Sequence, residues 1–361
     1  MTETDFVPET LTSDISFGKV TWKAPSNIAL VKYWGKLPGQ IPANASVSFT
    51  LEDSATITTL TYRKLGKEQN DFSFDIFLDD IPVPEFIPKI RTFLGRIERY
   101  LPFIKEYHLE IKTTNSFPHS SGIASSASGM AALALCLMEI ERRINPELTK
   151  LYFETKASFL ARLGSGSACR SINGEIVQWG KHPGINSGSD LYGTPYPHKV
   201  HAVFKDYQDT ILLVHQGQKQ VSSTVGHQLM NGHIFAGQRF KQAAQNIEEL
   251  KQIFETGDLN SFIQVVESEA LTLHAMMMTS IPYFVLMKPN TFKIIEKIWE
   301  FRKKTALHPC FTLDAGANVH VLYPFKEKEE VMAFIRDELV EYCEDGLFIQ
   351  DRLGNGAIKI E

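Results

Sequence analysis

Three scarcities in this 361-residue sequence argue against whole classes of protein. Its four cysteines, Cys136, Cys169, Cys310 and Cys343, lie far apart and form no C-x-x-C pair, which disfavours a disulfide framework and a zinc site. Basic residues are not in excess, since the net charge is -5, whereas a general nucleic-acid-binding protein would be basic. Nowhere do about 18 apolar residues follow one another without interruption, so we expect no membrane span.

The start of the chain lacks the basic residues and the apolar core of a signal peptide. We expect its first residues, up to about residue 17, to form a flexible lead-in, because they are acidic and polar. Dispersed cysteines fit a reducing compartment, so the expected location is the cytoplasm. A chain of 361 residues exceeds the usual size of one hydrophobic core, and we therefore expect two closely packed domains.

The most distinctive stretch runs from Phe117 to Ile140. Its first half is rich in serine and glycine and its second half is dense in alanine and leucine, which predicts a tight loop opening a buried helix. Unpaired N–H groups at a helix start bind anions, and serine hydroxyls add donors without bulk. The stretch lacks the G-x-x-x-x-G-K-[ST] pattern of Walker-type sites, so an anion loop of another kind is expected. A serine-rich cap on a core helix is the alternative interpretation.

A second segment carries Lys32, Tyr33 and Lys36 close together beside Gly35. Ammonium groups and a phenol are suitable donors to phosphate, so these residues could clamp an anionic ligand. A solvated basic loop would explain them equally well.

A third segment, Gly164–Ser171, alternates glycines with Ser165 and Ser167 and then presents Arg170. Two hydroxyls and a guanidinium in so small a loop could converge on a phosphate or a carboxylate. The simpler interpretation is a surface arginine, but an arginine embedded in G-S-G-S-A-C-R favours a functional role.

The C-terminal half offers a carboxylate and a group of hydroxyls. Asp314 stands between two short apolar strands, and because burying an unpaired carboxylate is unfavourable, it is a candidate base or electrostatic partner. A plain turn aspartate is the alternative. Ser222, Ser223 and Thr224 follow a predicted strand, and a polar turn explains this triplet as well as a binding site does.

Hydrophobic periodicity predicts strands and helices along the whole chain. We expect strands at 18–24, 47–51, 55–62, 72–78, 108–113, 174–179, 210–215, 310–313 and 319–323. We expect helices at about 86–101, in the second half of 117–140, and at 146–163, 236–254, 259–274, 291–303 and 326–340. The glycine- and proline-rich run 181–198 indicates the approach to a domain boundary. Met276–Met278 favour core packing, and His274 favours a structural role over metal binding.

Six motifs in order, APSNIALVKYWGK, NSFPHSSGIASSASG, GSGSACRS, KQVSST, LHAMM and LDAGAN, together resemble mevalonate diphosphate decarboxylases. These belong to the galactokinase, homoserine kinase, mevalonate kinase and phosphomevalonate kinase superfamily. The serine-rich loop alone would indicate only the superfamily. The resemblance implies an α+β fold with an N-terminal domain, residues 1–200, like the second domain of ribosomal protein S5. A ferredoxin-like C-terminal domain, residues 201–361, would contribute the catalytic aspartate to the cleft between them.

The resemblance also implies a reaction and a set of site residues. The tertiary 3-hydroxyl of 5-diphosphomevalonate would be phosphorylated by ATP, and loss of phosphate and CO2 would give isopentenyl diphosphate, in the mevalonate pathway of isoprenoid biosynthesis. Asp314 would deprotonate or orient the hydroxyl, Lys32 would lie near the transferred phosphoryl group, and Arg170 would hold the substrate carboxylate. The implied substrate-binding residues are Tyr33, Lys36, Ser165, Ser167, Arg170, Ser222, Ser223 and Thr224. The implied ATP-binding residues are Pro118, Ser120, Ser121, Gly122, Ser125, Ser126 and Ser128.

The expected partners are ATP and a phosphorylated mevalonate, without nucleic acid or membrane, and a homodimer is possible. Mg²⁺ is expected with ATP from the chemistry of phosphoryl transfer, while no residue is assigned as a metal ligand.

The sequence departs from the family's pattern near the predicted site. Leu37 stands where members commonly carry an arginine, Ala317 where proline is frequent, and His227 where methionine is frequent, and the loop LPGQIPANAS is shortened. Loss of a cation near the substrate could alter recognition of a diphosphate against a monophosphate. A decarboxylase of mevalonate 5-phosphate and a mevalonate 3-kinase are therefore alternatives. An alternative of another class is a catalytically silent nucleotide-binding homologue.

Overall fold

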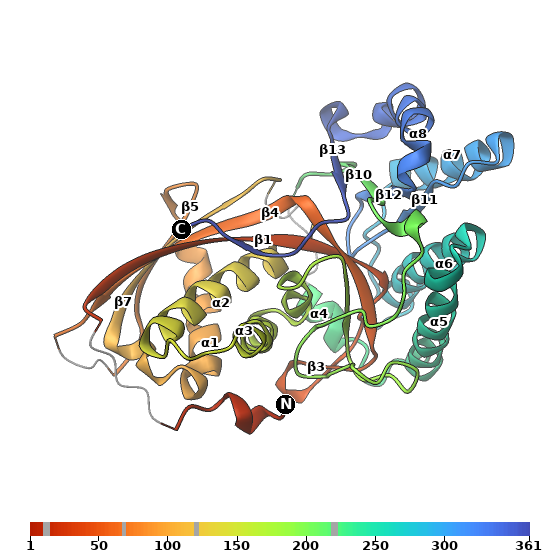
Figure 1. The fold of residues 1–361 in the computed structure, drawn as a ribbon. Coiled ribbons are helices and arrows are strands. Elements are labelled where there is room, and N and C mark those ends of the chain that lie inside the picture. Colours follow the sequence, from red (N-terminus) through yellow and green to blue (C-terminus); the bar gives the residue numbers. More distant parts are fainter. Residues whose placement is uncertain (10–14, 67–69, 119–122, 218–222) are drawn as a thin grey trace.

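The structure is a computed structural model, described here over residues 1–9, 15–66, 70–118, 123–217 and 223–361, without the side chains of 223 and 224. In the described residues a small sheet pairs β2 (Lys36–Leu37) with β3 (Ile41–Pro42). Two larger sheets, each covered by helices, make up the body of the molecule (Figure 1). One sheet has eight strands and lies in the N-terminal part of the fold, and the other has four and lies in the C-terminal part. Both helices and sheets are therefore substantial in each part, which confirms the predicted α+β class.

Two long strands form the spine of the larger sheet. β1 (Phe17–Val31) and β4 (Ser46–Lys64) pair antiparallel along nearly their whole length. β7 (Tyr107–Asn115) pairs antiparallel with β4, and β5 (Ser73–Leu78) pairs parallel with β7. The shorter strands are β6 (Ile81–Pro82), β8 (Ile176–Trp179), β9 (Thr194–Pro195) and β14 (Ile358–Lys359).

Three helices cover one face of this sheet (Figure 1): α1 (Ile87–Ile97), α2 (Ser125–Ile144) and α3 (Lys150–Gly164). α2 is apolar on nearly every side and is buried between the sheet and α3, as its alanine and leucine content predicts. Its start, at Ser125, lies directly after the serine-rich loop. The predicted order of strand, loop and buried helix is thus confirmed, although residues 119–122 lie outside the described part of the chain.

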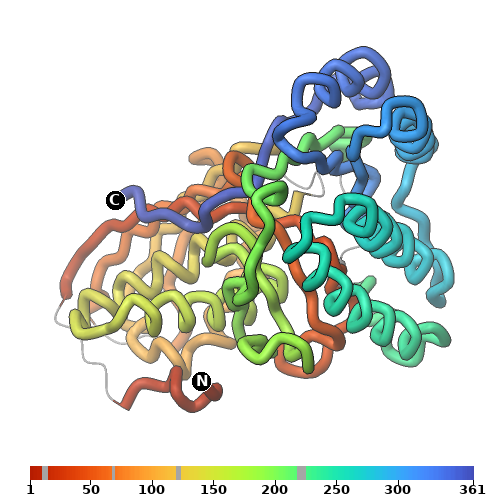
Figure 2. The backbone as a smooth tube through the Cα atoms, turned by 45° about the vertical axis from the view of Figure 1, so that its right-hand side comes forward, coloured from red at the N-terminus to blue at the C-terminus, as the bar shows by residue number. Residues whose placement is uncertain are grey.

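The smaller sheet is antiparallel with the order β11-β12-β10-β13. Its strands are β11 (Cys310–Thr312), β12 (Val319–Tyr323), β10 (Gln208–Leu212) and β13 (Phe348–Arg352). The helices around it are α5 (Ala236–Thr256), α6 (Leu259–Met278), α7 (Pro289–Thr305) and α8 (Lys328–Phe334), with the short α4 (Ser223–Gln228) before them. Figure 2 shows α5 and α6 side by side. Gly257, with a φ of +80°, makes their tight connection, and the Asp258 side chain caps α6 by accepting from the Ser261 N–H at 3.1 Å.

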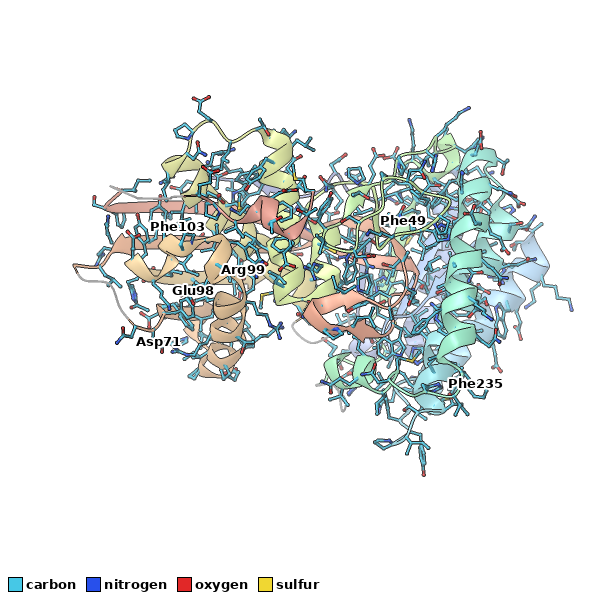
Figure 3. All side chains as sticks on the ribbon, turned by 90° about the horizontal axis from the view of Figure 1, so that it is seen from below. Phe49, Asp71, Glu98, Arg99, Phe103 and Phe235 are labelled. Atoms are coloured by element: carbon cyan, nitrogen blue, oxygen red, sulfur yellow. The ribbon has the colours of Figure 1, made fainter. Side chains whose placement is uncertain are left out.

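The two sheets share part of their core. Phe49 of β4 lies between the two parts of the molecule (Figure 3), with its ring 5.8 Å from that of Tyr207 and 6.2 Å from that of Phe262. The end of the chain also crosses between them, because β14 returns to pair with β1. The division near residue 200 stays a prediction. No helix in the described ranges is both long enough and apolar enough to cross a membrane.

Several sequence-based expectations were wrong. Residues 3–6 form a 3-10 helix rather than a flexible lead-in, because the Phe6 ring is fully buried and stacks on Phe159 at 4.5 Å. The strands predicted at 47–51 and 55–62 are one continuous strand, β4. The helix predicted at 326–340 leaves α-helical geometry after Phe334 and continues as π and 3-10 turns. The short strands β13 and β14 were not predicted.

Candidate active site

A cleft of about 1330 Å³ brings together segments that are far apart in the sequence. Nine of the predicted site residues line it: Lys32, Tyr33, Lys36, Ser125, Ser126, Ser165, Ser167, Arg170 and Asp314. Pro118 and Ser128 are not among the lining residues. Ser120, Ser121, Gly122 and Ser222 lie outside the described residues, and only the backbone of Ser223 and Thr224, in α4, is described.

Lys32 and Asp314 form an ion pair at the centre of this cleft. Lys32 follows the end of β1 and Asp314 follows β11, and the Lys32 Nζ lies 3.1 Å from the Asp314 Oδ1. The lysine side chain is 2% exposed and the aspartate side chain is 28% exposed, so the carboxylate is the more open partner. Burial lowers the pKa of Lys32, while the charges of Asp314 and Glu269 oppose this effect and that of Arg170 adds to it.

Arg170 is held rigidly beside this pair. It lies in the 3-10 helix Gly166–Ser171 that follows α3, where its Nε donates to the Asn27 Oδ1 at 3.2 Å and another guanidinium nitrogen donates to the Ser46 hydroxyl. The guanidinium carbon also lies 5.9 Å from the ring centre of Trp179. Burial lowers the pKa of Arg170, yet an arginine retains its charge at physiological pH. A fixed cation is therefore available to an anionic group in the cleft.

The start of α2 presents the anion-binding features expected of the serine-rich loop. Ala124 has a left-handed conformation with a φ of 49°, and the helix begins at Ser125 without an acidic side chain in its first turn. Ser125 and Ser126 line the cleft, and the Ser126 hydroxyl accepts from the Lys89 Nζ at 2.8 Å. Ser128 differs, because its buried hydroxyl is bonded to the Thr56 hydroxyl at 2.6 Å and joins helix to sheet.

Sequence reasoning missed two cations that α1 contributes to the cleft, Lys89 and Arg96. They are seven residues apart, two helical turns, and a basic pair at this spacing on an amphipathic helix was the available signal. Burial and then the charges of Arg96 and Lys89 lower the pKa of Lys36 to about 8. Concentrated positive charge of this kind is typical of a site for a multiply charged anion.

His227, like Leu37, departs from the family pattern and lines the cleft. Its ring lies between Tyr33, at 4.2 Å, and Trp34, at 4.6 Å, and its Nδ1 accepts the Gly35 N–H at 3.0 Å. Burial and the nearby charges of Lys36 and Arg170 lower the pKa of His227 well below its usual range. The neutral ring therefore carries its proton on Nε2.

His274 has a structural role, as predicted, because it bonds the protein backbone. Its Nε2 donates to the Asp314 backbone oxygen at 3.1 Å. Met276 and Met277 are buried as predicted, whereas Met278 is 41% exposed.

The α+β fold, the buried helix that follows the serine-rich loop and the Lys–Asp pair in the cleft agree with the class that the motifs resemble, that of galactokinase, homoserine kinase, mevalonate kinase and phosphomevalonate kinase. Residues 24–190 match the model of the diphosphomevalonate decarboxylase-like N-terminal domain. Residues 210–351 match the model of the mevalonate 5-diphosphate decarboxylase C-terminal domain. The chain belongs to the mevalonate diphosphate decarboxylase family.

Curated relatives and solved structures agree with this assignment. The diphosphomevalonate decarboxylase of Candida albicans is 27% identical over 325 residues, which are 86% of each chain. A crystal structure of mevalonate diphosphate decarboxylase from Staphylococcus aureus has a TM-score of 0.81 at 27% identity, covering 96% of this chain and 98% of that one. A structure described as MDDEF in complex with MVAPP, AMPPCP and magnesium has a TM-score of 0.80 at 26% identity, covering 96% of this chain and 100% of that one.

Proposed function

We propose that this protein catalyses the ATP-dependent decarboxylation of 5-diphosphomevalonate, giving isopentenyl diphosphate, ADP, phosphate and CO2. One observation carries the proposal. The Lys32–Asp314 pair, with its 3.1 Å contact, opens onto the same cleft as Arg170 and the first turn of α2. Phosphoryl transfer needs positioning and charge stabilisation more than covalent catalysis by the protein, and this set of groups fits that need.

Each of the three charged residues has a chemical task in the proposed reaction. The Asp314 carboxylate orients the 3-hydroxyl and takes its proton as the oxygen attacks the γ-phosphoryl group of ATP. The Lys32 ammonium stabilises negative charge on the transferred group. The 3-phosphate then departs with the C3–O bonding electrons, the bond from C2 to the carboxylate breaks to release CO2, and its electrons form the C2–C3 double bond. Arg170 holds the carboxylate in place for this cleavage.

Three basic residues of the cleft, Lys36, Lys89 and Arg96, form what we call its cationic end. This concentration of positive charge favours a diphosphate over a monophosphate as the substrate. Lys36 lies there with Lys89 and Arg96, so cations from α1 stand in for the arginine that Leu37 replaces. Tyr33, Ser165 and Ser167 line the same cleft and are proposed as further phosphate and substrate contacts. Ser222, Ser223 and Thr224 are proposed from the resemblance alone.

We place the ATP phosphates at the start of α2, where Ser125 and Ser126 line the cleft. Pro118, Ser120, Ser121 and Gly122 complete the proposed loop from the resemblance. Ser128 is not proposed as an ATP contact, because its buried hydroxyl bonds Thr56. Serine hydroxyls are hard oxygen donors that Mg²⁺ takes together with substrate phosphates, so Ser125 and Ser126 fit a bound Mg²⁺. When bound with ATP, Mg²⁺ would neutralise charge on the phosphate oxygens.

The test compares mevalonate, its 5-phosphate and its 5-diphosphate, with ADP and CO2 measured in the same reactions. We expect both products in equal amounts and fastest from the diphosphate. ADP without CO2 would identify a 3-kinase, and faster turnover of the 5-phosphate would identify a monophosphate decarboxylase. ATP binding without ADP formation from any of the three would identify a catalytically silent homologue.

We further propose a division into domains near residue 200, with β14 reaching back to the first. The two family matches, 24–190 and 210–351, support this division. Four buried, unpaired cysteines support a cytoplasmic location.

A homodimer is also proposed, supported by exposed apolar side chains at one end of the helices α5 and α6. The side chains of Ile234, Ile281 and Tyr283 are 80%, 90% and 78% exposed, and that of Phe235 is 44% exposed. His233 joins this segment to the end of α6 by bonding the Met276 carbonyl at 3.1 Å, and Phe235 lies at the edge of the C-terminal part (Figure 3). Light scattering should give twice the chain mass, and the monomer mass would reject the dimer.

A further inference from the structure

The peptide groups of Lys32 are bound by side chains instead of by a neighbouring strand. β1 ends at Val31, where its pairing with β4 stops, so Lys32 continues past the ladder. The Lys32 N–H donates to the Glu269 Oε2 at 2.8 Å, and the Lys32 carbonyl accepts from the Arg239 guanidinium at 3.0 Å. Asn44 donates to the same carbonyl at 3.0 Å. Buried peptide groups need such partners, and here two oppositely charged side chains provide them.

Glu269 of α6 and Arg239 of α5 form an ion pair whose side chains are both 0% exposed. The guanidinium donates to both carboxylate oxygens, at 2.8 and 2.5 Å, and Asn246 donates to the Glu269 Oε1 at 2.6 Å. With the Lys32 N–H, the carboxylate accepts four hydrogen bonds. A fully buried ion pair is retained only where its geometry is well satisfied, and this one is directed at the backbone of a single cleft residue.

A residue further along α6 bonds the backbone of Asp314, the partner of Lys32 in the cleft. His274 lies five residues after Glu269 on α6 and donates from its Nε2 to the Asp314 carbonyl at 3.1 Å. α6 contacts both β1 and β11, the strands that end just before Lys32 and Asp314 (Figure 2). One helix therefore bonds the backbone of both residues.

We propose that α6 positions the reacting pair, with Glu269 and Arg239 fixing Lys32 and with His274 fixing Asp314. Glu269, Arg239 and His274 are positioning residues, because they act through the backbones of Lys32 and Asp314. The inference rests on the proposed function, in which the ammonium and the carboxylate must meet the substrate hydroxyl and the phosphoryl group together. Displacement of a catalytic group by about 1 Å can lower a rate about 100-fold, so such a scaffold has a large effect on turnover.

The charge of Glu269 adds an electrostatic effect to the geometric one. The charged groups that act on the Lys32 ammonium are Asp314, Glu269 and Arg170, and Arg239 lies against its carbonyl. The negative charges of Asp314 and Glu269 raise the pKa of Lys32 against the effect of burial, and Arg170 lowers it. Removal of the Glu269 charge should therefore lower this pKa further, so that Lys32 loses its proton at a lower pH.

Glu267 provides a matched control two residues away on the same helix. It pairs with Arg302 and accepts from the Trp299 indole at 2.9 Å, so it too is a largely buried carboxylate with an arginine partner. Two of its partners, Arg302 and Trp299, lie on α7. The third is the Phe311 N–H of β11 at 3.3 Å, an acceptor contact that a glutamine oxygen can keep, and none of the three is Lys32 or Asp314. Glu267→Gln and Glu269→Gln therefore remove the same charge from similar environments on the same element.

The experiment measures kcat and KM for the full-length variants, with the pH profile of kcat. We expect Glu269→Gln to lower kcat about 30- to 100-fold, with KM changed less than about threefold, and to move the basic limb of the profile to lower pH. Glu267→Gln should lose comparable thermal stability but keep kcat within about twofold and leave the profile unchanged. Arg239→Lys, which keeps the charge but not the paired donors, should lower kcat in the same manner and to a smaller extent.

Crystal structures of Glu269→Gln, Arg239→Lys and Glu267→Gln test the inference without any activity. The contact between the Lys32 Nζ and Asp314 should open in the first two and remain at 3.1 Å in the control. Equal kcat and an unchanged contact in all three would overturn the inference, as would an equal loss of kcat in the control. If the wild-type protein forms no ADP or CO2, the proposed function fails, and the three structures decide the positioning role by themselves. If Glu269→Gln does not fold, Arg239→Lys and the control give the same decision.

Discussion

In the described part of the chain, two buried lysines form ion pairs with carboxylates, and one of the two pairs faces the cleft. Lys156 bonds Glu141 at 2.6 Å between α3 and α2, where the side chains are 0% and 3% exposed. Lys32 bonds Asp314 at 3.1 Å, where they are 2% and 28% exposed. Burial lowers the pKa of both lysines, and the carboxylate partner raises it in both. Each pair thus joins a buried lysine to a carboxylate whose charge opposes the effect of burial on the lysine pKa.

The difference lies in what surrounds each carboxylate. Asp314 opens onto a cleft that also contains Arg170, whereas Glu141 is enclosed by the helices of the N-terminal core. A buried Lys–carboxylate pair is therefore not by itself a sign of catalysis. The distinguishing features are a partly open carboxylate and further cations that face the same space.

The largest expected effect is on turnover at the cleft pair. Asp314→Asn removes the proposed proton acceptor while keeping the size of the side chain, so kcat should fall by about 100- to 10,000-fold. KM for both substrates should change far less, since the residue acts mainly in the transition state. Steady-state kinetics with ADP and CO2 detection measure this, and an unchanged kcat would remove Asp314 from the mechanism.

The matching substitution in the Lys156–Glu141 pair should lower the stability of the fold without changing kcat. Glu141→Gln leaves the fully buried Lys156 without its counter-charge, so the free energy of unfolding should fall by about 3 kcal/mol. Urea unfolding of the full chain measures this, with kcat within about twofold of wild type at 25 °C. A kcat loss as large as that of Asp314→Asn would erase the distinction between the two pairs.

Arg170→Lys sharpens the comparison by changing the arginine beside the Lys32–Asp314 pair while keeping its charge. A lysine cannot reproduce the planar set of donors, and hydrogen bonds to charged groups contribute about 1.5–3 kcal/mol. We therefore expect KM for the substrate to rise roughly 10- to 150-fold. Arg162→Lys is the control, in a buried arginine that does not line the cleft and donates only to the backbone carbonyls of Leu191 and Gly39 in the described residues. It should change KM far less than Arg170→Lys.

The smallest expected effect is a pH dependence at the cationic end of the cleft. Lys36 has a pKa of about 8, so its charge is present below that pH and is lost above it. Because the anionic substrate needs the charge, KM should rise as the pH increases through about 8. Lys36→Arg remains charged over this range, and its KM should show no such rise. The same rise in both proteins would exclude Lys36 as its cause.

Local chemistry explains what could be predicted of the fold. The change from a serine- and glycine-rich run to an alanine- and leucine-rich run predicted a buried helix in the second half of 117–140, and α2 is that helix. It begins at Ser125, about one turn earlier than predicted. Alternation predicted β7 correctly, because Tyr107, Leu109 and Ile111 all point into the core. These signals lie within a few residues of one another in the chain.

Long-range partners explain what was missed. We predicted separate strands at 47–51 and 55–62. The Asp351 carboxylate of β13 accepts the N–H groups of Glu52, Asp53 and Ser54 between them, and the strand continues. Phe6 was assigned to a flexible segment because its burial site is formed by α3, more than a hundred residues later. No local pattern contains such information.

The sequence by itself determined the groups that the site uses: the serine-rich loop, the G-S-G-S-A-C-R segment and the D-A-G-A-N turn. Tertiary structure alone decided how they meet, since Lys32 and Asp314 are 282 positions apart and pair only where β1 and β11 end beside α6. Glu267 and Glu269 make the same point. They are one chemical type on one helix, but Glu269 faces Lys32 and Glu267 faces α7, because side-chain direction on a helix rotates by about 100° per residue.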